Sequence, residues 1–569
     1  MKKIKLFVSV LLSILLIFQL SLVAGASDSK DVNHENASFE TAHKFVYNAL
    51  LDDGPRIPDS ESRLLPQTNT RANPSSVDLS SSQYFPPVRS QYNIGSCVSW
   101  ASTYYQFGYQ VASKYSLNVN NTNNLFSPKW VHNITIDGVD NPGSSFSSAY
   151  SVLKSNGAVR YSKFPPLSDW VDDPTTEYIP WHLNIDDMTE ALRYRISDYQ
   201  FLEFAEISEE DTPITSYNSS CLNNMKAFLS AGFVLTYSTD FGESNGVTNT
   251  DWIYGTLSNQ TNSDYNGDYV CIRASNIKPG RQGHAMAIVG YNDNIRYDIN
   301  GNGSIESFER GAFKVVNSHG TSWENEGFVW VMYDALNKVS NASNQNPSNR
   351  QAIFEGYGYY VINVKEYPCD VIAKVTLTHF DRRQIKLDLG VSDTSVNYPY
   401  ETMTTMLSLR LFGERVNFSG TGTTSQTATF VFDFGDLYDL DTERSNCYIE
   451  ILESALSGAA IVKEVELLDG TGKTVALETT DKTVNGTTEI YKFKLGIVGD
   501  VNNDASITTE DASLIQKYVA SLVTLSNDDL KVADVNGDER VTASDATAIQ
   551  KYLANIITQF DNGSVLLLE

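Results

Sequence analysis

The pattern of apolar and polar positions changes several times along the chain. From about residue 74 to about 364, helical and alternating periods are mixed, which predicts a domain with both helices and strands. From 367 to about 495, short β-branched and aromatic runs alternate with Gly, Asp, Asn and Ser, which predicts a β-sandwich. The expected strands of this module include Val371–Thr378, Gln384–Leu389, Leu407–Leu411, Ala428–Phe434 and Tyr448–Leu452.

The first residues have the pattern of an export signal. Lys2, Lys3 and Lys5 precede an apolar run that ends near Leu20, and small residues follow up to Ala26. This predicts a signal peptide at residues 1–26 and a secreted protein. A membrane anchor is the alternative, but the apolar run is short for a bilayer span and no later stretch is apolar enough. The polar segment 27–72 is expected to be a propeptide or a spacer.

Composition narrows the classes of function. The chain has 569 residues, 41% of them hydrophobic and 11% aromatic, which fits several globular domains. Its net charge of −27 disfavours binding to nucleic acid or to an anionic membrane. The five cysteines are too few for a disulfide scaffold, and an odd number leaves at least one thiol unpaired. A pair between Cys221 and Cys271 remains open.

An acidic loop followed by a helical pattern occurs twice near the end of the chain. Oxygen atoms at loop positions one, three, five, seven and twelve have the spacing of an EF-hand-type calcium loop. The candidate ligands are Asp500, Asn502, Asp504, Ser506 and Asp511 in the first loop and Asp534, Asn536, Asp538, Arg540 and Asp545 in the second, with Ser506 and Arg540 offering carbonyls. Both loops depart from an EF-hand, because Ala505 and Glu539 occupy position six in place of Gly and Asp ends each loop in place of Glu.

The repeat resembles the dockerin family over residues 496–558, which form a small helical module. An acidic tail without structure is disfavoured because both copies repeat the ligands together with the helix. The resemblance implies two calcium ions and, as a partner, the cohesin domain of a scaffoldin, which would place the chain in an extracellular or cell-surface complex of the cellulosome type.

A third loop of this kind lies at residues 298–309. Its candidate calcium ligands are Asp298, Asn300, Asn302, Ser304 and Glu309, and it has Gly303 at position six. The alternative is an acidic hairpin without an ion. We expect a third calcium ion here, which would stiffen the region between two strands.

A candidate nucleophile lies near the start of the mixed region. Cys97 follows Gly95 and precedes a helical pattern that continues to about Ala112. The positive end of a helix dipole lowers the pKa of a thiol and favours the thiolate. Gln91 lies six residues before Cys97.

His284 and Asn317 complete this candidate set. His284 lies at the start of an apolar strand pattern, and Asn317 follows another one. Together the four residues resemble the papain family of cysteine peptidases over about residues 73–365. The resemblance implies a two-lobed α+β domain in which Cys97 and His284 form a thiolate–imidazolium pair, Asn317 orients His284, and Gln91 lines the oxyanion hole. The expected activity is hydrolysis of peptide bonds in a protein or peptide substrate.

The chain also departs from this family. Val98 follows the nucleophile where the family usually has Trp, and His319 replaces the Trp that shields the Asn–His hydrogen bond. We expect this replacement either to expose the pair or to compete for its hydrogen bond. A weak or inactive peptidase-like binding protein is therefore the alternative function. A carbohydrate-active enzyme is disfavoured, since no pair of carboxylates has a recognisable context.

Overall fold

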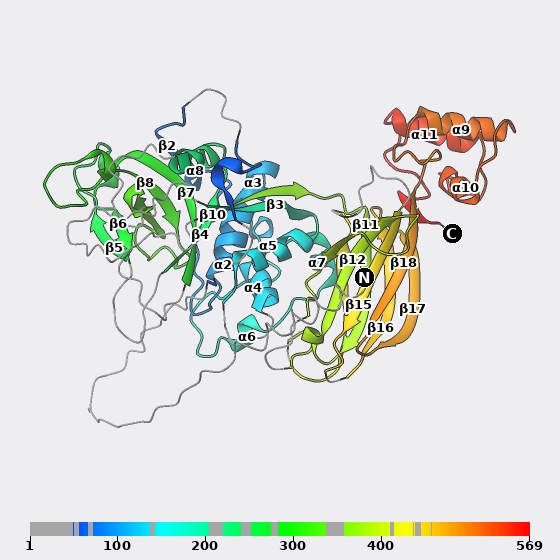
Figure 1. Ribbon diagram of the computed structural model, residues 1–569, viewed down its shortest axis with the longest axis horizontal. Coiled ribbons are helices and arrows are strands. Elements are labelled where there is room, and N and C mark those ends of the chain that lie inside the picture. The colour runs from blue at the N-terminus through cyan, green and yellow to red at the C-terminus, as the bar shows by residue number, and fades with distance from the viewer. Residues whose placement is uncertain are drawn as a thin grey trace, which may run out of the picture. The chain divides into compact units, whose positions relative to one another are not determined.

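The computed structural model describes residues 49–50, 56–66, 72–136, 143–203, 220–240, 252–274, 283–336, 358–409, 415–420, 422–435, 437, 445–456 and 458–568 (Figure 1). The expected signal peptide and most of segment 27–72 lie outside these residues. None of the helices in the described part has the length and apolar character needed to cross a bilayer. No disulfide bond is formed among the described residues, and Cys221 and Cys271 both lie buried.

One long helix carries the candidate nucleophile at its first residue. It is continuous through α2 (Cys97–Ser99), the wider turns of η3 (Trp100–Phe107) and α3 (Gly108–Tyr115). The remaining helices of the mixed region are α4 (Pro128–Ile136), α5 (Phe146–Ser155), α6 (Thr175–Tyr178), α7 (Ile185–Ala191) and α8 (Ser220–Ser230). Ser145 begins α5 with a capping box and Asn184 caps α7, so local polar side chains define these starts.

A ten-stranded sheet organises the mixed region among the described residues. Its strand order is β1-β3-β10-β4-β7-β8-β9-β6-β5, and β2 pairs with β7. The strands are β1 (Arg56–Pro58), β2 (Ser76–Asp78), β3 (Tyr194–Glu203), β4 (Leu235–Asp240), β5 (Trp252–Thr256), β6 (Tyr269–Ala274), β7 (Gly283–Arg296), β8 (Arg310–Val316), β9 (Phe328–Met332) and β10 (Gly358–Glu366). Because β1 pairs with β3, part of segment 27–72 is built into this sheet.

Both faces of the central strand β7 are buried. Met286 and Ile288 pack with α8, while the alternate residues Ala287 and Val289 pack with η3. This explains the nearly unbroken apolar run of β7, since a strand covered on both faces has no polar side. The helix that starts at Cys97 therefore packs directly on the strand that starts next to His284 (Figure 1).

The next region contains two antiparallel sheets that share a buried core. One has the order β14 (Gln426–Asp433), β11 (Val371–His379), β16 (Ala460–Asp469), β17 (Thr474–Val484), and the other β13 (Glu401–Thr404), β12 (Ile385–Asp393), β15 (Ser445–Glu453), β18 (Thr488–Ile497), β19 (Val565–Leu567). The strand expected at Leu407–Leu411 is wrong in its described part, because residues 407–409 follow β13 without joining a strand. The Leu407 carbonyl still accepts from the Leu387 N–H at 3.0 Å.

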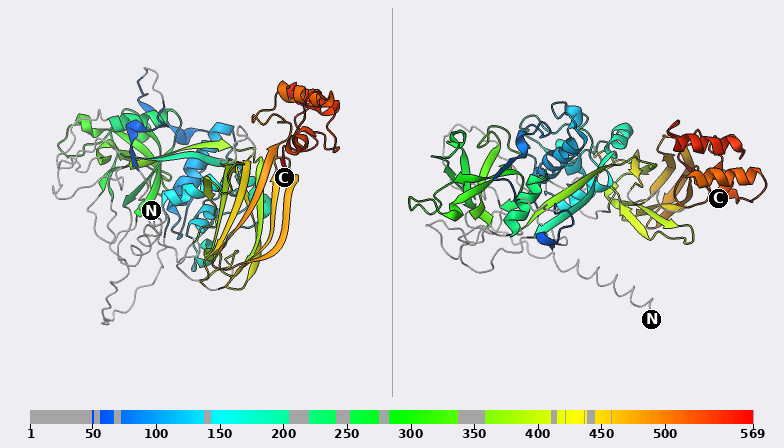
Figure 2. Two further views of the ribbon diagram at one scale, coloured as in Figure 1. Left: turned by 45° about the vertical axis from the view of Figure 1, so that its right-hand side comes forward. Right: turned by 90° about the horizontal axis from the view of Figure 1, so that it is seen from above.

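Three helices follow β18: α9 (Thr509–Val519), α10 (Asn527–Ala533) and α11 (Ala543–Leu553). The helices α9 and α11 lie side by side, as the orange and red ribbons of Figure 2 show. After α11 the chain returns and adds β19 to β18.

Candidate functional site

The loop before the long helix presents Cys97 at the first helical residue. Cys97 is fully buried, and Ser96 precedes it as the N-cap residue. The Gln91 side chain is fixed at both ends, since its Nε2 donates to the Ile94 carbonyl at 2.8 Å and its Oε1 accepts from the Ser318 hydroxyl. These bonds hold the Gln91 amide within the nucleophile loop and join that loop to the segment after β8.

His284 and Asn317 meet through the pairing of β7 with β8. The Nε2 of His284 donates to Oδ1 of Asn317 at 2.7 Å, and both side chains are fully buried. The bond leaves Nδ1 as the basic nitrogen of a neutral His284 ring. Asn317 is itself oriented, because its Oδ1 also accepts from the Ser318 N–H at 2.7 Å.

His319 contacts both Asn317 and His284, and the sequence alone did not predict these contacts. The Nδ2 of Asn317 donates to Nδ1 of His319 at 3.1 Å, and the His319 ring stacks on the His284 ring with 5.1 Å between centroids. Trp323 covers His319 edge-on. His319 is 3% exposed, so the expected exposure of the His284–Asn317 pair is wrong. His319 also does not compete with His284, because it uses the amide nitrogen and not the oxygen of Asn317.

Strand register is the signal that would have found this contact. Ala287 pairs with Val316 in the antiparallel hairpin of β7 and β8. Continuing that register past the end of β8 places His284 opposite His319, and directly opposed side chains in a hairpin interact. The pairing predicts the contact once the hairpin is known.

Burial controls the charge of the candidate base. It lowers the pKa of His284 to about 4, although the bond to Asn317 acts in the opposite direction. Burial, together with the neighbouring His284, also lowers the pKa of His319. Burial therefore favours the neutral imidazole of His284 in this structure.

A short segment from before the mixed region lies against these residues. The Ala49 N–H donates to the Gly283 carbonyl at 2.7 Å, next to His284, and the Leu50 N–H donates to the Ser144 carbonyl at 3.0 Å. Ala49 is buried. The backbone at residues 49–50 is therefore held against the start of β7 next to His284, a contact that sequence patterns did not indicate.

The two repeated acidic loops share most of their internal hydrogen bonds. In the first, Asp511 accepts from the N–H groups of Val501 at 2.8 Å and Asn502 at 3.1 Å through one oxygen, and from Thr508 at 2.8 Å through the other. Asp500 accepts from Asp504 and Ala505. Asp545 and Asp534 repeat these roles in the second loop.

The fit of these loops to calcium follows from their oxygen atoms. The side-chain oxygens at positions one, three, five and twelve belong to one tight turn, and calcium takes such oxygen ligands. Burial raises the pKa of Asp500 and of Asp534, an electrostatic cost that a bound cation would remove. Among the described residues no three His, Cys, Asp or Glu side chains are grouped as a metal cluster, so amide and carbonyl oxygens would have to complete each site.

The loop at residues 298–309 repeats the pattern outside this module. It connects β7 with β8, and Glu309 accepts from Ile299 at 2.8 Å, Asn300 at 3.1 Å and Glu306 at 2.9 Å. Asp298 accepts from Asn302 at 3.1 Å and Gly303 at 2.7 Å. In the two repeated loops, the acidic residues at positions one and twelve likewise accept hydrogen bonds from backbone N–H groups of their own loop.

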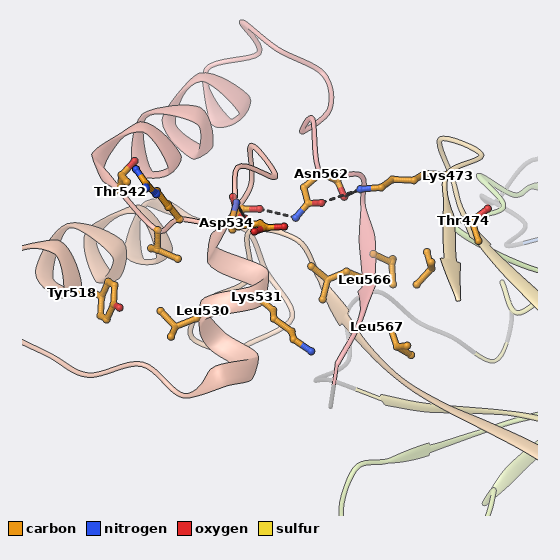
Figure 3. Close-up of a pocket in the computed structure, with 15 residues that line it drawn as sticks. Lys473, Thr474, Tyr518, Leu530, Lys531, Asp534, Thr542, Asn562, Leu566 and Leu567 are labelled. Atoms are coloured by element: carbon orange, nitrogen blue, oxygen red, sulfur yellow. Dashed lines mark hydrogen bonds between the residues drawn. The ribbon is translucent and has the colours of Figure 1, made fainter. Parts of the chain in front are cut away.

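The second repeated loop contacts the segment that leads into β19. Figure 3 shows Asn562 between Asp534 and Lys473: its Nδ2 donates to the Asp534 carbonyl at 2.7 Å, and its Oδ1 accepts from Lys473 at 2.9 Å. A pocket of about 840 Å³ lies beside this contact and includes Leu530 and Leu566 in its wall. The loop is therefore linked through Asn562 to Lys473, the residue before β17.

Comparisons with known proteins bear on both regions. Residues 498–554 match the model of the Dockerin type I domain. A search of curated proteins gave no match. Similar solved structures include xylellain, a cysteine protease from Xylella fastidiosa, at 18% identity and a TM-score of 0.31, covering 51% of this chain and 87% of that chain. Digestive procathepsin L 3 from the Tenebrio molitor larval midgut has 15% identity and a TM-score of 0.30, with coverage of 54% and 73%.

A third similar structure is the proform of the ragweed pollen cysteine protease Amb a 11, at 13% identity and a TM-score of 0.31, with coverage of 54% and 69%. At these values the activity has to be argued from the side chains of this chain. The chain carries a dockerin type I domain at residues 498–554, and its structural neighbours include papain-like cysteine proteases.

Proposed function

We propose that the protein is a secreted cysteine endopeptidase that is attached to a scaffold through its dockerin domain. The observation that carries the activity is the hydrogen bond of 2.7 Å between His284 and Asn317, on a strand that packs against the helix starting at Cys97. A nucleophile, a base and a group that orients the base are thereby brought together from distant parts of the sequence.

The residues divide the reaction among them. Nδ1 of neutral His284 takes the proton of the Cys97 thiol as its sulfur attacks the peptide carbonyl carbon. His284 then gives that proton to the leaving amine, and the acyl group stays on Cys97 as a thioester. Water, deprotonated by His284, hydrolyses the thioester and restores the thiol. Asn317 keeps the imidazole in the tautomer that both steps need.

Gln91 and the backbone of the nucleophile would stabilise the oxyanion. One N–H of the Gln91 side chain donates to Ile94. Its second N–H and the Cys97 N–H at the helix start would serve as donors to the tetrahedral intermediate. The bond from Ser318 fixes the Gln91 amide in advance, so little reorganisation is needed during the reaction.

Segment 27–72 acts as a propeptide in this proposal. The Ala49 N–H donates to the Gly283 carbonyl, next to His284, and the Ala49 side chain is buried. A peptide substrate would have to displace this segment. Cleavage that removes residues 27–72 is therefore expected to activate the enzyme, and the contact at Ala49 supports a propeptide over a spacer.

Calcium would hold the dockerin in the form that a cohesin domain binds. Asp500, Asp504 and Asp511 would be first-loop ligands, and Asp534, Asp538 and Asp545 would be their counterparts. The loop at 298–309, with similar hydrogen bonds, is proposed to hold a third ion and to stiffen the hairpin that carries His284 and Asn317. Calcium here has a structural role and takes no part in the covalent steps.

The alternative of a non-catalytic binding protein loses its main support. It depended on His319 disturbing the His284–Asn317 pair, but His319 accepts from the other end of the Asn317 amide. The stack of His319 on His284 takes over the covering role expected of Trp.

Labelling of the thiol followed by turnover tests the proposal. The processed, calcium-loaded protein should react at Cys97 with an epoxide that alkylates active thiols, and should cleave a quenched peptide library. Cys97→Ala should abolish both, while Cys447→Ala, a buried thiol whose pKa burial raises, should change neither. A folded, processed protein without turnover or labelling would exclude the peptidase.

A further inference from the structure

A pocket of about 390 Å³ opens beside the candidate catalytic residues. Its wall combines Arg89 and Tyr92 from the loop before the nucleophile, Trp170 from a later loop, and His319 from the segment after β8. No Asp or Glu side chain of the described residues lines it. The volume lies in the range of sites for small ligands or single side chains.

Arg89 gives this pocket a fixed positive charge. Its Nε donates to the Tyr104 hydroxyl at 3.1 Å and its Nη1 to the Tyr161 hydroxyl at 3.4 Å. The guanidinium also lies over the Tyr161 ring, 4.8 Å from its centroid. Burial raises the pKa of Tyr161, so its hydroxyl stays neutral and does not cancel the charge. The arginine is therefore positioned by neutral groups.

The described residues contain no carboxylate that forms an ion pair with Arg89. Other arginines of the chain do have such partners, for example Arg160 with Glu190 at 2.9 Å and Arg193 with Glu366 at 2.6 Å. In a chain with 69 acidic residues, an arginine that lines a pocket without an acidic partner indicates a site for an external anion.

The pocket lies on the side where the leaving part of a substrate would be. His319 lines it, and the His319 ring stacks on the ring of His284. In the proposed reaction His284 gives its proton to the leaving amine, so residues after the cleaved bond lie on the His284 side. The segment at Ala49 contacts Gly283 and Ser144, neither of which lines the pocket.

We propose, resting on the peptidase function above, that this pocket binds a carboxylate on the leaving side of the substrate and that Arg89 determines this specificity. Tyr92 and Trp170 form one wall, with ring centroids 5.7 Å apart, and the Tyr92 hydroxyl is fixed by the Ser168 carbonyl at 2.6 Å. The carboxylate comes either from an Asp or Glu side chain or from the free C-terminus of a short leaving peptide.

Matched quenched peptides test this in the processed, calcium-loaded enzyme. In the first set, the two peptides of a pair differ only by Glu or Gln, at one of the three positions after the cleaved bond. In the second set, the peptides end within these positions in either a free carboxylate or an amide. The expected kcat/KM is roughly tenfold higher for the carboxylate member of at least one pair, because a charge-assisted hydrogen bond is worth about this factor. The ratio should fall as salt is added.

Variants locate the effect. Arg89→Gln should reduce the ratio to near one, and Arg89→Lys should keep part of it. Arg193→Gln is the control, since it removes the charge of an exposed arginine that does not line the pocket, and it should keep the wild-type ratio. If Arg89→Gln does not fold, the wild-type ratio and its salt dependence still decide.

The outcomes separate the two proposals. A response to the Glu pair alone assigns the site to an acidic side chain, and a response to the C-terminal pair alone assigns it to a free carboxylate. Equal kcat/KM within both pairs would overturn the carboxylate site and leave the peptidase standing. Failure to cleave a neutral aminocoumarin peptide, without labelling of Cys97, would overturn both.

Discussion

The candidate catalytic site and the dockerin loops are assembled in opposite ways. Each dockerin loop collects its oxygen atoms within one short stretch, and local hydrogen bonds such as that from Val501 to Asp511 set its shape. The catalytic groups instead meet because a helix packs on a strand and because two strands pair in one register. Sequence therefore defines the first site almost completely, whereas the second depends on the tertiary structure.

The largest expected effect is the loss of peptide turnover in a variant that keeps its binding to cohesin. His284→Ala removes the base, and general acid–base catalysis contributes several powers of ten, so we expect kcat/KM to fall roughly a thousandfold. Binding to a cohesin domain should stay unchanged. Peptide turnover and calorimetric titration with cohesin measure the two effects. Loss of cohesin binding in this variant would show that the regions are coupled.

Removal of calcium should act mainly on the dockerin and much less on the catalytic region. A ligand held at a thousand times its Kd stabilises the folded state by about 4 kcal/mol, so chelation should unfold the dockerin helices and abolish cohesin binding. A separate, smaller loss of thermal stability is expected for the catalytic region if 298–309 holds an ion. Asp298→Ala should remove this second shift alone, and an identical calcium stoichiometry in that variant would contradict the third site.

Acid should weaken the catalytic region through its buried histidines. Burial lowers the pKa of His284 to about 4 and that of His132 to about 3, below the ordinary value of 6.5. Between these values and 6.5 the unfolded chain binds more protons than the folded one, so stability falls as pH drops through this range and is constant above it. For each histidine, every pH unit below 6.5 and above its folded pKa lowers the free energy of unfolding by about 1.4 kcal/mol.

Denaturant titrations at several pH values measure this effect. His132→Gln should flatten the slope below pH 6 if the variant folds, because it removes one of the buried neutral rings. A stability that does not change between pH 7 and pH 4.5 would contradict the burial of these histidines.

The sequence predicted the features that depend on local patterns and missed those that depend on tertiary packing. The acidic repeats, the helix after Cys97 and the strands expected at Val371–Thr378 and Tyr448–Leu452 have strong local patterns, and the latter fall within β11 and β15. The expected strand at Leu407–Leu411 failed because an apolar run can fill a core without joining a sheet. The stack of His319 on His284 and the contact of Ala49 depend on long-range packing, which local patterns do not encode.

The smallest predicted effect compares the calcium loops with one another. Position six has a positive φ in all three: +67° at Ala505, +65° at Glu539 and +83° at Gly303. A residue with Cβ pays about 1 kcal/mol in this region, whereas glycine does not. We therefore expect Ala505→Gly to stabilise the first loop by about 1 kcal/mol, offset in part by the greater freedom of glycine in the unfolded chain.

Gly303→Ala is the matched reverse change. A Cβ added there meets no atom within 4 Å, so its cost reports the backbone conformation alone. Thermal unfolding with saturating calcium should show a small rise for Ala505→Gly and a fall of similar size for Gly303→Ala. A fall for Ala505→Gly or a rise for Gly303→Ala would mean that the three loops, despite similar hydrogen bonds, do not share one backbone conformation in solution. A rise for Ala505→Gly together with a fall for Gly303→Ala would extend the likeness of the 298–309 loop to the dockerin loops from hydrogen bonding to energetics.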